Sequence, residues 1–217
     1  MSATDLLALG TATVAEAWPA SRLMAGGFQP LATGTAAHES ALERDFVTLT
    51  GFLDPEAAVT AQPVTLTYLH EGIRHRYTPD YLVSRANGFR ELIEIKYQAD
   101  LYQLASRLKN AFAAAQGWAV EQGATFRVVT EREIRGTILD NAKRLLPLRN
   151  APLDAAMMIR VMTAMTSSRA IPIRTLLAHW PKDRAGALAV LWRLIARGAL
   201  RVDLSKPITM DSRITLP

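Results

Sequence analysis

Between residues 38 and 130 of the 217-residue chain, the spacing of hydrophobic and polar residues predicts a mixed α/β domain. Leu42, Phe46 and Leu49 are spaced i, i+4, i+7 in HESALERDFVTLTGF, which predicts a helix ending at Asp54-Pro55. Four strand-like segments follow, with one long helix before the last of them. The strands are PVTLTYL (63–69), RHRYTPDYLV (74–83), FRELIEIKY (89–97) and TFRVVT (125–130), and the helix spans 99–120.

Two prolines in LPLRNAPLD, Pro147 and Pro152, interrupt this pattern and predict a domain boundary. Residues 1–36 are rich in Ala, Thr and Gly with little periodicity, so we expect an irregular N-terminal arm before a domain at 37–147. After the boundary, three helices and a weakly alternating hairpin predict a small winged-helix-like domain at 151–217. The helices are 154–167, 172–179 and DRAGALAVLWRLIARGAL, and the hairpin strands are LRVDL and ITMDSRITL.

Composition excludes several classes of site. The chain has no cysteine, so it has no disulfide, thiol nucleophile or thiolate zinc site. Its four histidines form no i, i+4 pair, and no glycine-rich phosphate loop is present, so neither a zinc site nor ATP hydrolysis is expected. The N-terminus lacks a basic segment followed by an apolar run, and no apolar stretch reaches the ~18 residues of a membrane span. We therefore expect a soluble, cytoplasmic protein.

The net charge of +5 is unevenly distributed. Residues 1–150 contain 15 Lys and Arg against 16 Asp and Glu, whereas residues 151–217 contain 10 against 4. This asymmetry indicates an anionic partner for the last third of the chain, although a solvated basic surface gives the same pattern. The candidate DNA-binding or partner-binding residues there are Arg184, Arg193, Arg197 and Arg201.

Asp80, Glu94 and Lys96 are charged residues on strands that are otherwise apolar. Glu94 and Lys96 share one face of their strand because side chains alternate with period two. The turn before that strand decides where Asp80 lies. A two-residue turn would place Asp80 opposite Ile95, whereas a three-residue loop, Ala86-Asn87-Gly88, would place it opposite Glu94. Gly88 supplies the left-handed residue that a three-residue hairpin loop requires.

Two opposed carboxylates destabilise a sheet unless they share a proton or bind a cation. Oxygen ligands suit Mg²⁺, with Mn²⁺ as a substitute, and such an ion activates water for attack near neutral pH. The helix at 38–52 adds Glu39 and Glu43, of which Glu43 adjoins the apolar stripe. Each carboxylate also has an ordinary explanation, as part of a strand end, a wet strand face or a helix surface.

The order of a helix glutamate, Pro-Asp in YTPDYLV and Glu-x-Lys in LIEIKY resembles the PD-(D/E)xK nuclease superfamily, which implies a restriction-endonuclease-like core. The blocks ESALERDFVTLTGFLDPEAAVTAQPVTL, YTPDYLV, IEIK and GWAVEQGATFRVVTEREI, within 38–135, are similar to TnsA-like transposon endonuclease subunits. The resemblance implies that Glu43, Asp80, Glu94 and Lys96 are catalytic and that the three carboxylates bind Mg²⁺. Glu39 is the alternative to Glu43.

The resemblance further implies DNA cleavage at the 5′ ends of a transposon, together with a TnsB-like transposase and a TnsC-like ATPase regulator. In this family a small winged C-terminal domain docks on the ATPase. Two other functions fit the same residues: a stand-alone restriction or resolvase-like nuclease, and a non-catalytic DNA-binding adaptor that keeps the nuclease fold as a scaffold.

Overall fold

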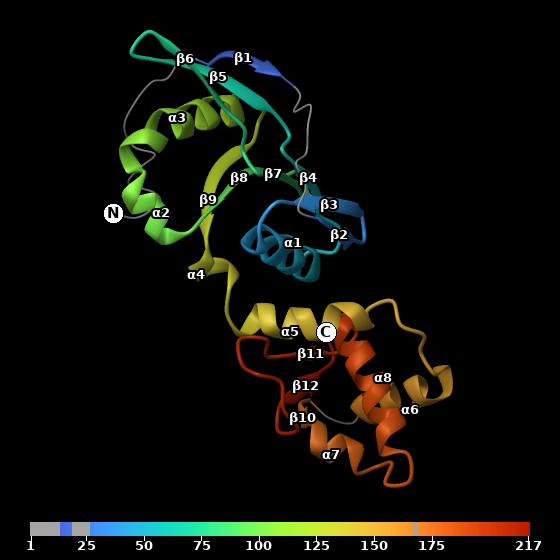
Figure 1. Cartoon of the computed structure of the whole chain (residues 1–217). Coiled ribbons are helices and arrows are strands. Elements are labelled where there is room, and N and C mark those ends of the chain that lie inside the picture. The colour runs from blue at the N-terminus through green and yellow to red at the C-terminus, as the bar shows by residue number, and fades with distance from the viewer. Residues whose placement is uncertain (1–13, 19–26, 167–168) are drawn as a thin grey trace. The chain divides into compact units, whose positions relative to one another are not determined.

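A four-stranded sheet organises the N-terminal part of the chain in the computed structural model (Figure 1). The structure describes residues 14–18, 27–166 and 169–217, which divide into two units, Met1–Arg135 and Gly136–Pro217. The sheet has the order β4-β7-β8-β9, with β9 parallel to β8 and the other pairs antiparallel. Its strands are β4 (Ala58–Ala61), β7 (Tyr81–Ser84), β8 (Arg90–Lys96) and β9 (Thr125–Thr130).

The remaining elements of this unit lie around that sheet. Because β8 and β9 are parallel, a crossover must connect them, and two helices provide it. A second sheet has the order β1-β5-β6, and α1 packs near the β2-β3 hairpin. These elements are β1 (Val14–Trp18), β2 (Gly27–Leu31), β3 (Gly34–His38), α1 (Ala41–Leu53), β5 (Thr65–His70), β6 (Ile73–Tyr77), α2 (Gln98–Gln103), α3 (Ala105–Glu121) and α4 (Glu131–Ile134).

The core of the first unit forms where α3 packs on β5 and β9. One face of α3 is nearly all alanine around a fully buried Phe112, and these small side chains let the helix approach the sheets closely. The Phe112 ring packs against the rings of Phe126 on β9, at 5.4 Å, and Tyr77 on β6, at 6.1 Å. Phe112 therefore joins the β1-β5-β6 sheet to the β4-β7-β8-β9 sheet at Tyr77, the last residue of β6 and three residues before Asp80.

The helix predicted at 38–52 is found as α1, but it begins at Ala41, so Glu39 lies before it rather than on it. The predicted strands are found as β5, β8 and β9. The single strand predicted over 74–83 is wrong: the chain breaks at Thr78-Pro79 into β6 and β7, which belong to different sheets. Proline has no N–H to continue a ladder, which explains the break. The long helix divides at Leu104 into α2 and α3.

The irregular arm predicted for 1–36 is wrong where the structure describes it, because β1, β2 and most of β3 lie there. The rest of that arm, 1–13 and 19–26, lies outside the described residues. The chain also divides earlier than predicted, at Arg135/Gly136. The prolines at 147–152 fall inside the second unit because α5 (Thr137–Leu145) and η1 (Leu146–Leu148) pack against α8 (Arg184–Ala196).

The second unit contains the predicted helices and hairpin. Its chain order is α5, η1, α6 (Ala155–Thr166), β10 (Ile171–Pro172), α7 (Ile173–Leu177), α8, β11 (Arg201–Val202) and β12 (Arg213–Thr215). The strands form a small antiparallel sheet in the order β10-β12-β11. The buried Asn141 amide on α5 donates to the carbonyls of Leu204 and Lys206 at 3.0 and 2.9 Å, so α5 is tied to the hairpin loop. Among the helices described in either unit, none combines the length and apolar character needed to cross a membrane.

Candidate active site

The β7-β8 hairpin has the register that brings Asp80 opposite Glu94. Tyr81 pairs with Ile93 and Ser84 with Arg90, so the next pair outward is Asp80 with Glu94. Three loop residues connect the strands, since the Arg85 N–H donates to the Phe89 carbonyl at 2.9 Å. Gly88 has a φ of +84°, the left-handed conformation that the loop requires. The three-residue loop predicted from the sequence is therefore confirmed.

Asp80 is held from both neighbouring strands. Its Oδ2 accepts a hydrogen bond from the Ile95 N–H on β8 at 2.6 Å, and its main-chain carbonyl accepts one from the Gln62 N–H after β4 at 2.7 Å. Burial, followed by the nearby charge of Glu94, raises the pKa of Asp80 well above its usual value, although Lys96 and the Ile95 hydrogen bond oppose the rise. The Asp80 carboxylate is thus fixed in place and electrostatically unfavourable when ionised.

Glu94 is almost completely buried, with 2% of the residue exposed. Its Oε1 forms a 2.6 Å ion pair with Nζ of Lys96, and its Oε2 accepts a 2.6 Å hydrogen bond from the Tyr77 hydroxyl. Burial raises the pKa of Glu94 despite these two partners. Burial alone would lower the pKa of Lys96, but Glu94 and Asp80 outweigh it and raise this pKa, which keeps the ammonium charged.

Tyr77 was missed from the sequence, although it stands three residues before Asp80. Its hydroxyl group is aimed at Glu94 because β6 ends there and its ring packs on Phe112. Burial, with the charge of Glu94, raises the pKa of Tyr77 well above its usual value, so the hydroxyl remains a donor. Strand alternation alone could not have revealed this contact, because β6 and β8 belong to different sheets.

Glu39 and Glu43 lie in one pocket with Asp80, but only Glu43 is on α1, because the helix begins at Ala41 after its cap Ser40. The Glu43 carboxylate accepts from the Glu39 N–H at 2.7 Å, while the Glu43 N–H donates to Oγ of Ser40, which caps α1. The Glu39 carboxylate accepts from the Gln62 side-chain amide at 2.7 Å. The residues lining this pocket are Ala37, His38, Glu39, Glu43, Ala61, Gln62, Asp80 and Tyr81. Glu43 also raises the pKa of Asp80, as the smallest of several causes.

The three carboxylates do not form a ready metal cage. Within the described ranges, no group of three or more His, Asp or Glu side chains is arranged to hold a metal ion. Glu94 is engaged with Tyr77 and Lys96, and Glu43 with the helix cap. The Asp80 and Glu94 carboxylates are nevertheless the type of oxygen ligand that proteins commonly offer to Mg²⁺, one or two at a time, while the ion keeps several waters. The charge of Glu94 raises the pKa of Asp80, second to burial, so a cation beside Asp80 would relieve that repulsion.

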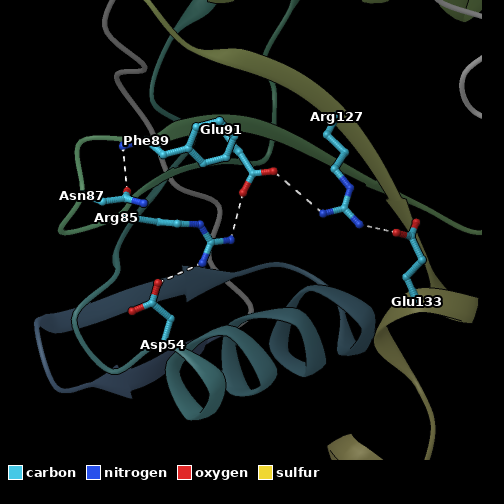
Figure 2. A network of polar contacts seen from close by, with 7 residues as sticks. All are labelled: Asp54, Arg85, Asn87, Phe89, Glu91, Arg127 and Glu133. Carbon is cyan, nitrogen blue, oxygen red and sulfur yellow. Dashed lines mark hydrogen bonds and ion pairs between the residues drawn. The ribbon is translucent and has the colours of Figure 1, made fainter.

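The other face of β8 carries a separate polar network (Figure 2). The Arg85 guanidinium forms 2.9 Å ion pairs with both Asp54, at the end of α1, and Glu91 on β8. Arg127 on β9 lies 3.8 Å from Glu91 and also pairs with Glu133 on α4. Glu91 and Glu94 are three positions apart, so they lie on opposite faces of the strand. This network ties the hairpin loop to α1 without entering the carboxylate pocket.

The four arginines singled out in the second unit differ in their surroundings. The Arg197 guanidinium donates to the carbonyls of Arg149 and Ala151 at 2.8 and 2.7 Å, so it braces the chain between η1 and α6. Nε of Arg193 is buried and has no hydrogen-bond partner among the residues that the structure describes. Arg184 and Arg201 are exposed. Arg197 is exposed as well, but its guanidinium is engaged by the Arg149 and Ala151 carbonyls.

Comparison with known proteins identifies one family. Residues 57–131 match the family described as TnsA-like endonuclease N terminal. This range is about a third of the chain and includes Asp80, Glu94 and Lys96, whereas Glu43 precedes it. No curated protein matches the chain. The resemblance seen in the motifs is thus confirmed over residues 57–131, where the chain is similar to a TnsA-like nuclease related to Tn7 transposition.

Proposed function

We propose that this protein is the Mg²⁺-dependent DNA endonuclease subunit of a heteromeric transposase and that it cuts at the 5′ ends of a transposon. The observation that carries the proposal is the β7-β8 register, which sets Asp80 against Glu94 with Lys96 paired to Glu94. These three residues lie inside the segment that matches the TnsA-like endonuclease family. A scaffold without catalytic activity has no use for so repulsive a pair.

Each residue has a distinct part in this proposal. Asp80 and Glu94 hold the divalent ion, and Glu43 supplies a third carboxylate from the pocket wall. When bound, the ion polarises the scissile phosphate and lowers the pKa of the attacking water. Lys96 orients the nucleophile and stabilises negative charge on the phosphate, because its ammonium is held at the site by Glu94. Tyr77 keeps the Glu94 carboxylate in one orientation.

The second unit is proposed to be a winged-helix-like partner-binding domain. Its order of helix, short strand, two helices and hairpin, with β12 between β10 and β11, is consistent with that architecture. By family analogy it docks on a TnsC-like ATPase regulator, while a TnsB-like transposase acts at the 3′ ends. The net positive charge of this unit would also attract the phosphates of the transposon-end DNA.

A nicking assay on transposon-end DNA with Mg²⁺, with and without the two partner proteins, tests this function. We expect cutting only when the partners are present, and we expect Asp80→Ala, Glu94→Ala and Lys96→Ala each to abolish it while assembly is retained. Glu121→Ala, at an exposed position at the end of α3, is the matched control and should cut normally. Full activity of any of the three site variants would remove that residue from the site.

The same assay separates the alternatives. Efficient cutting by the isolated protein would favour a stand-alone restriction or resolvase-like nuclease. An assembly that forms normally, while the 5′ strand stays uncut under every metal condition, would favour a non-catalytic adaptor.

A further inference from the structure

Gln62 adopts a strained backbone conformation at the edge of the pocket. Its φ is +45°, in the left-handed region, which is unfavourable for a residue with a side chain. Pro63 follows directly and further restricts the φ and ψ angles that Gln62 can adopt. Glu71 is the other non-glycine residue with positive φ in the described part of the chain, at +51°. Glu71 and Gly72 form the two-residue turn between β5 and β6, where positive φ is the rule. Gln62 lies at a strand end, where no such rule applies.

The two polar groups of Gln62 connect parts of the proposed active site. Its N–H bonds the Asp80 carbonyl, which extends the β4-β7 pairing one residue beyond Ala61 and Tyr81. Its side-chain amide donates to Oε1 of Glu39 at 2.7 Å. A glycine at position 62 would keep the hydrogen bond from the main-chain N–H to the Asp80 carbonyl and would remove the strain of the positive φ. The strained backbone at Gln62 coincides with a hydrogen bond from its side-chain amide to Glu39, which points to a role for that amide.

The contact with Glu39 bears on which of Glu39, just before α1, and Glu43, on α1, serves the site. Both line the pocket, but Glu43 is the one whose charge acts on both Asp80 and Lys96. We propose that Gln62 is a positioning residue of the nuclease: its amide fixes the Glu39 carboxylate at the end of β4, so that Glu43 serves as the helix carboxylate of the site. The inference rests on the proposed function and adds a residue outside the acidic motif.

Three variants isolate the amide. Gln62→Gly removes it, keeps the main-chain N–H and relieves the strain. Gln62→Gly combined with Glu39→Gln also removes the charge that the amide restrained. Glu71→Gly is the matched control, since it relieves a positive φ in a turn that does not line the pocket. If Gln62→Gly fails to fold, Gln62→Asn replaces it, because Asn tolerates this conformation and its shorter side chain does not reach Glu39.

The first measurement is the Mg²⁺ concentration that gives half of the maximal rise in melting temperature of the full chain. In Gln62→Gly we expect this concentration to fall at least threefold, because the released Glu39 carboxylate adds negative charge beside the ion. Adding Glu39→Gln should return it to the wild-type value, and Glu71→Gly should not change it. The melting temperature of metal-free Gln62→Gly should equal or exceed that of the wild type.

The second measurement is the rate of DNA cutting in the assembled transposase at saturating Mg²⁺. Gln62→Gly should cut at least tenfold more slowly, and the double variant should recover to within about threefold of wild type. Wild-type Mg²⁺ binding and cutting by Gln62→Gly, or no recovery on adding Glu39→Gln, would overturn the role of Gln62 while leaving the nuclease intact. A wild-type protein that neither responds to Mg²⁺ nor cuts would overturn the proposed function and this inference together.

Discussion

The main-chain N–H of Ile95 donates to Oδ2 of Asp80 at 2.6 Å, across the hairpin that joins β7 and β8. This contact turns the Asp80 carboxylate toward β8, at the position opposite Glu94. The donor is a main-chain N–H, so substituting the Ile95 side chain would leave this hydrogen bond and the orientation of the Asp80 carboxylate in place. It would also survive replacement of Asp80 by Asn, whose carbonyl oxygen can accept the same bond.

Asp80→Asn should therefore separate metal binding from folding. Without metal, its melting temperature should equal or exceed that of the wild type, because one repelling charge is removed from the pair. With Mg²⁺ at roughly ten times Kd, the wild type should gain about 1.4 kcal/mol, a rise of roughly 3–6 °C for a chain of this size. The variant should lose most of this rise. Melting curves in EDTA and in Mg²⁺ decide the question, and equal rises in both proteins would exclude Asp80 as a ligand.

The pH dependence of stability follows from the raised pKa of Asp80. The folded protein binds this proton more tightly than the unfolded chain, whose Asp pKa is about 3.9. The associated stability is fully present below that unfolded pKa and is lost as pH rises through the higher folded pKa. In EDTA, lowering the pH from about 8 to about 5 should thus increase the melting temperature of the wild type relative to Asp80→Asn. A difference independent of pH would show that Asp80 is not perturbed.

The sequence predicted this part of the site well because the physical constraints there are local. Strand alternation has a fixed period, and only the three-residue loop ending at Gly88 brings Asp80 and Glu94 face to face. The contribution of Tyr77 could not be predicted in the same way. It depends on the switch of sheets at Pro79 and on packing against Phe112, which comes much later in the chain. The domain boundary was also misplaced, because the attachment of α5 depends on contacts between Asn141 and the distant hairpin loop.

Tyr77→Phe should weaken the site without disturbing the core. The ring that packs on Phe112 remains, but Glu94 loses the hydroxyl that donates to Oε2. Loss of a hydrogen bond to a buried charged group costs about 1–3 kcal/mol, so the metal-free protein should melt at a lower temperature. We also expect slower DNA cutting with little change in the KM for DNA. Tyr102→Phe, at an exposed position on α2, is the control and should change neither quantity. Unchanged cutting by Tyr77→Phe would show that Glu94 needs no such support.

The network in Figure 2 should contribute to stability through Glu91, which is largely buried whereas Arg85 is partly exposed. Arg85→Met leaves Glu91 with Arg127 at 3.8 Å as its remaining ion-pair partner in the network drawn. We expect a loss of about 1–2 kcal/mol in the free energy of unfolding, measured by urea denaturation. Adding Glu91→Gln should recover part of this loss, because it removes the uncompensated buried charge. Arg132→Met, at an exposed position on α4, should be neutral. A double variant less stable than Arg85→Met would contradict this account.

The division at Arg135/Gly136 predicts that a fragment of residues 136–217 folds, whereas one of residues 151–217 does not. The shorter fragment lacks α5, whose Leu139, Ala142 and Leu145 are buried. It also lacks the Asn141 amide, which satisfies two carbonyls of the hairpin loop, and the Arg149 carbonyl that accepts from Arg197. Loss of this apolar face and these hydrogen bonds should remove cooperative unfolding, because a domain this small has little stability to spare. Thermal melting followed by circular dichroism should show a sigmoidal transition for 136–217 and a shallow, featureless change for 151–217. Equal cooperative transitions in both fragments would place α5 outside the folding unit and restore the boundary at the prolines.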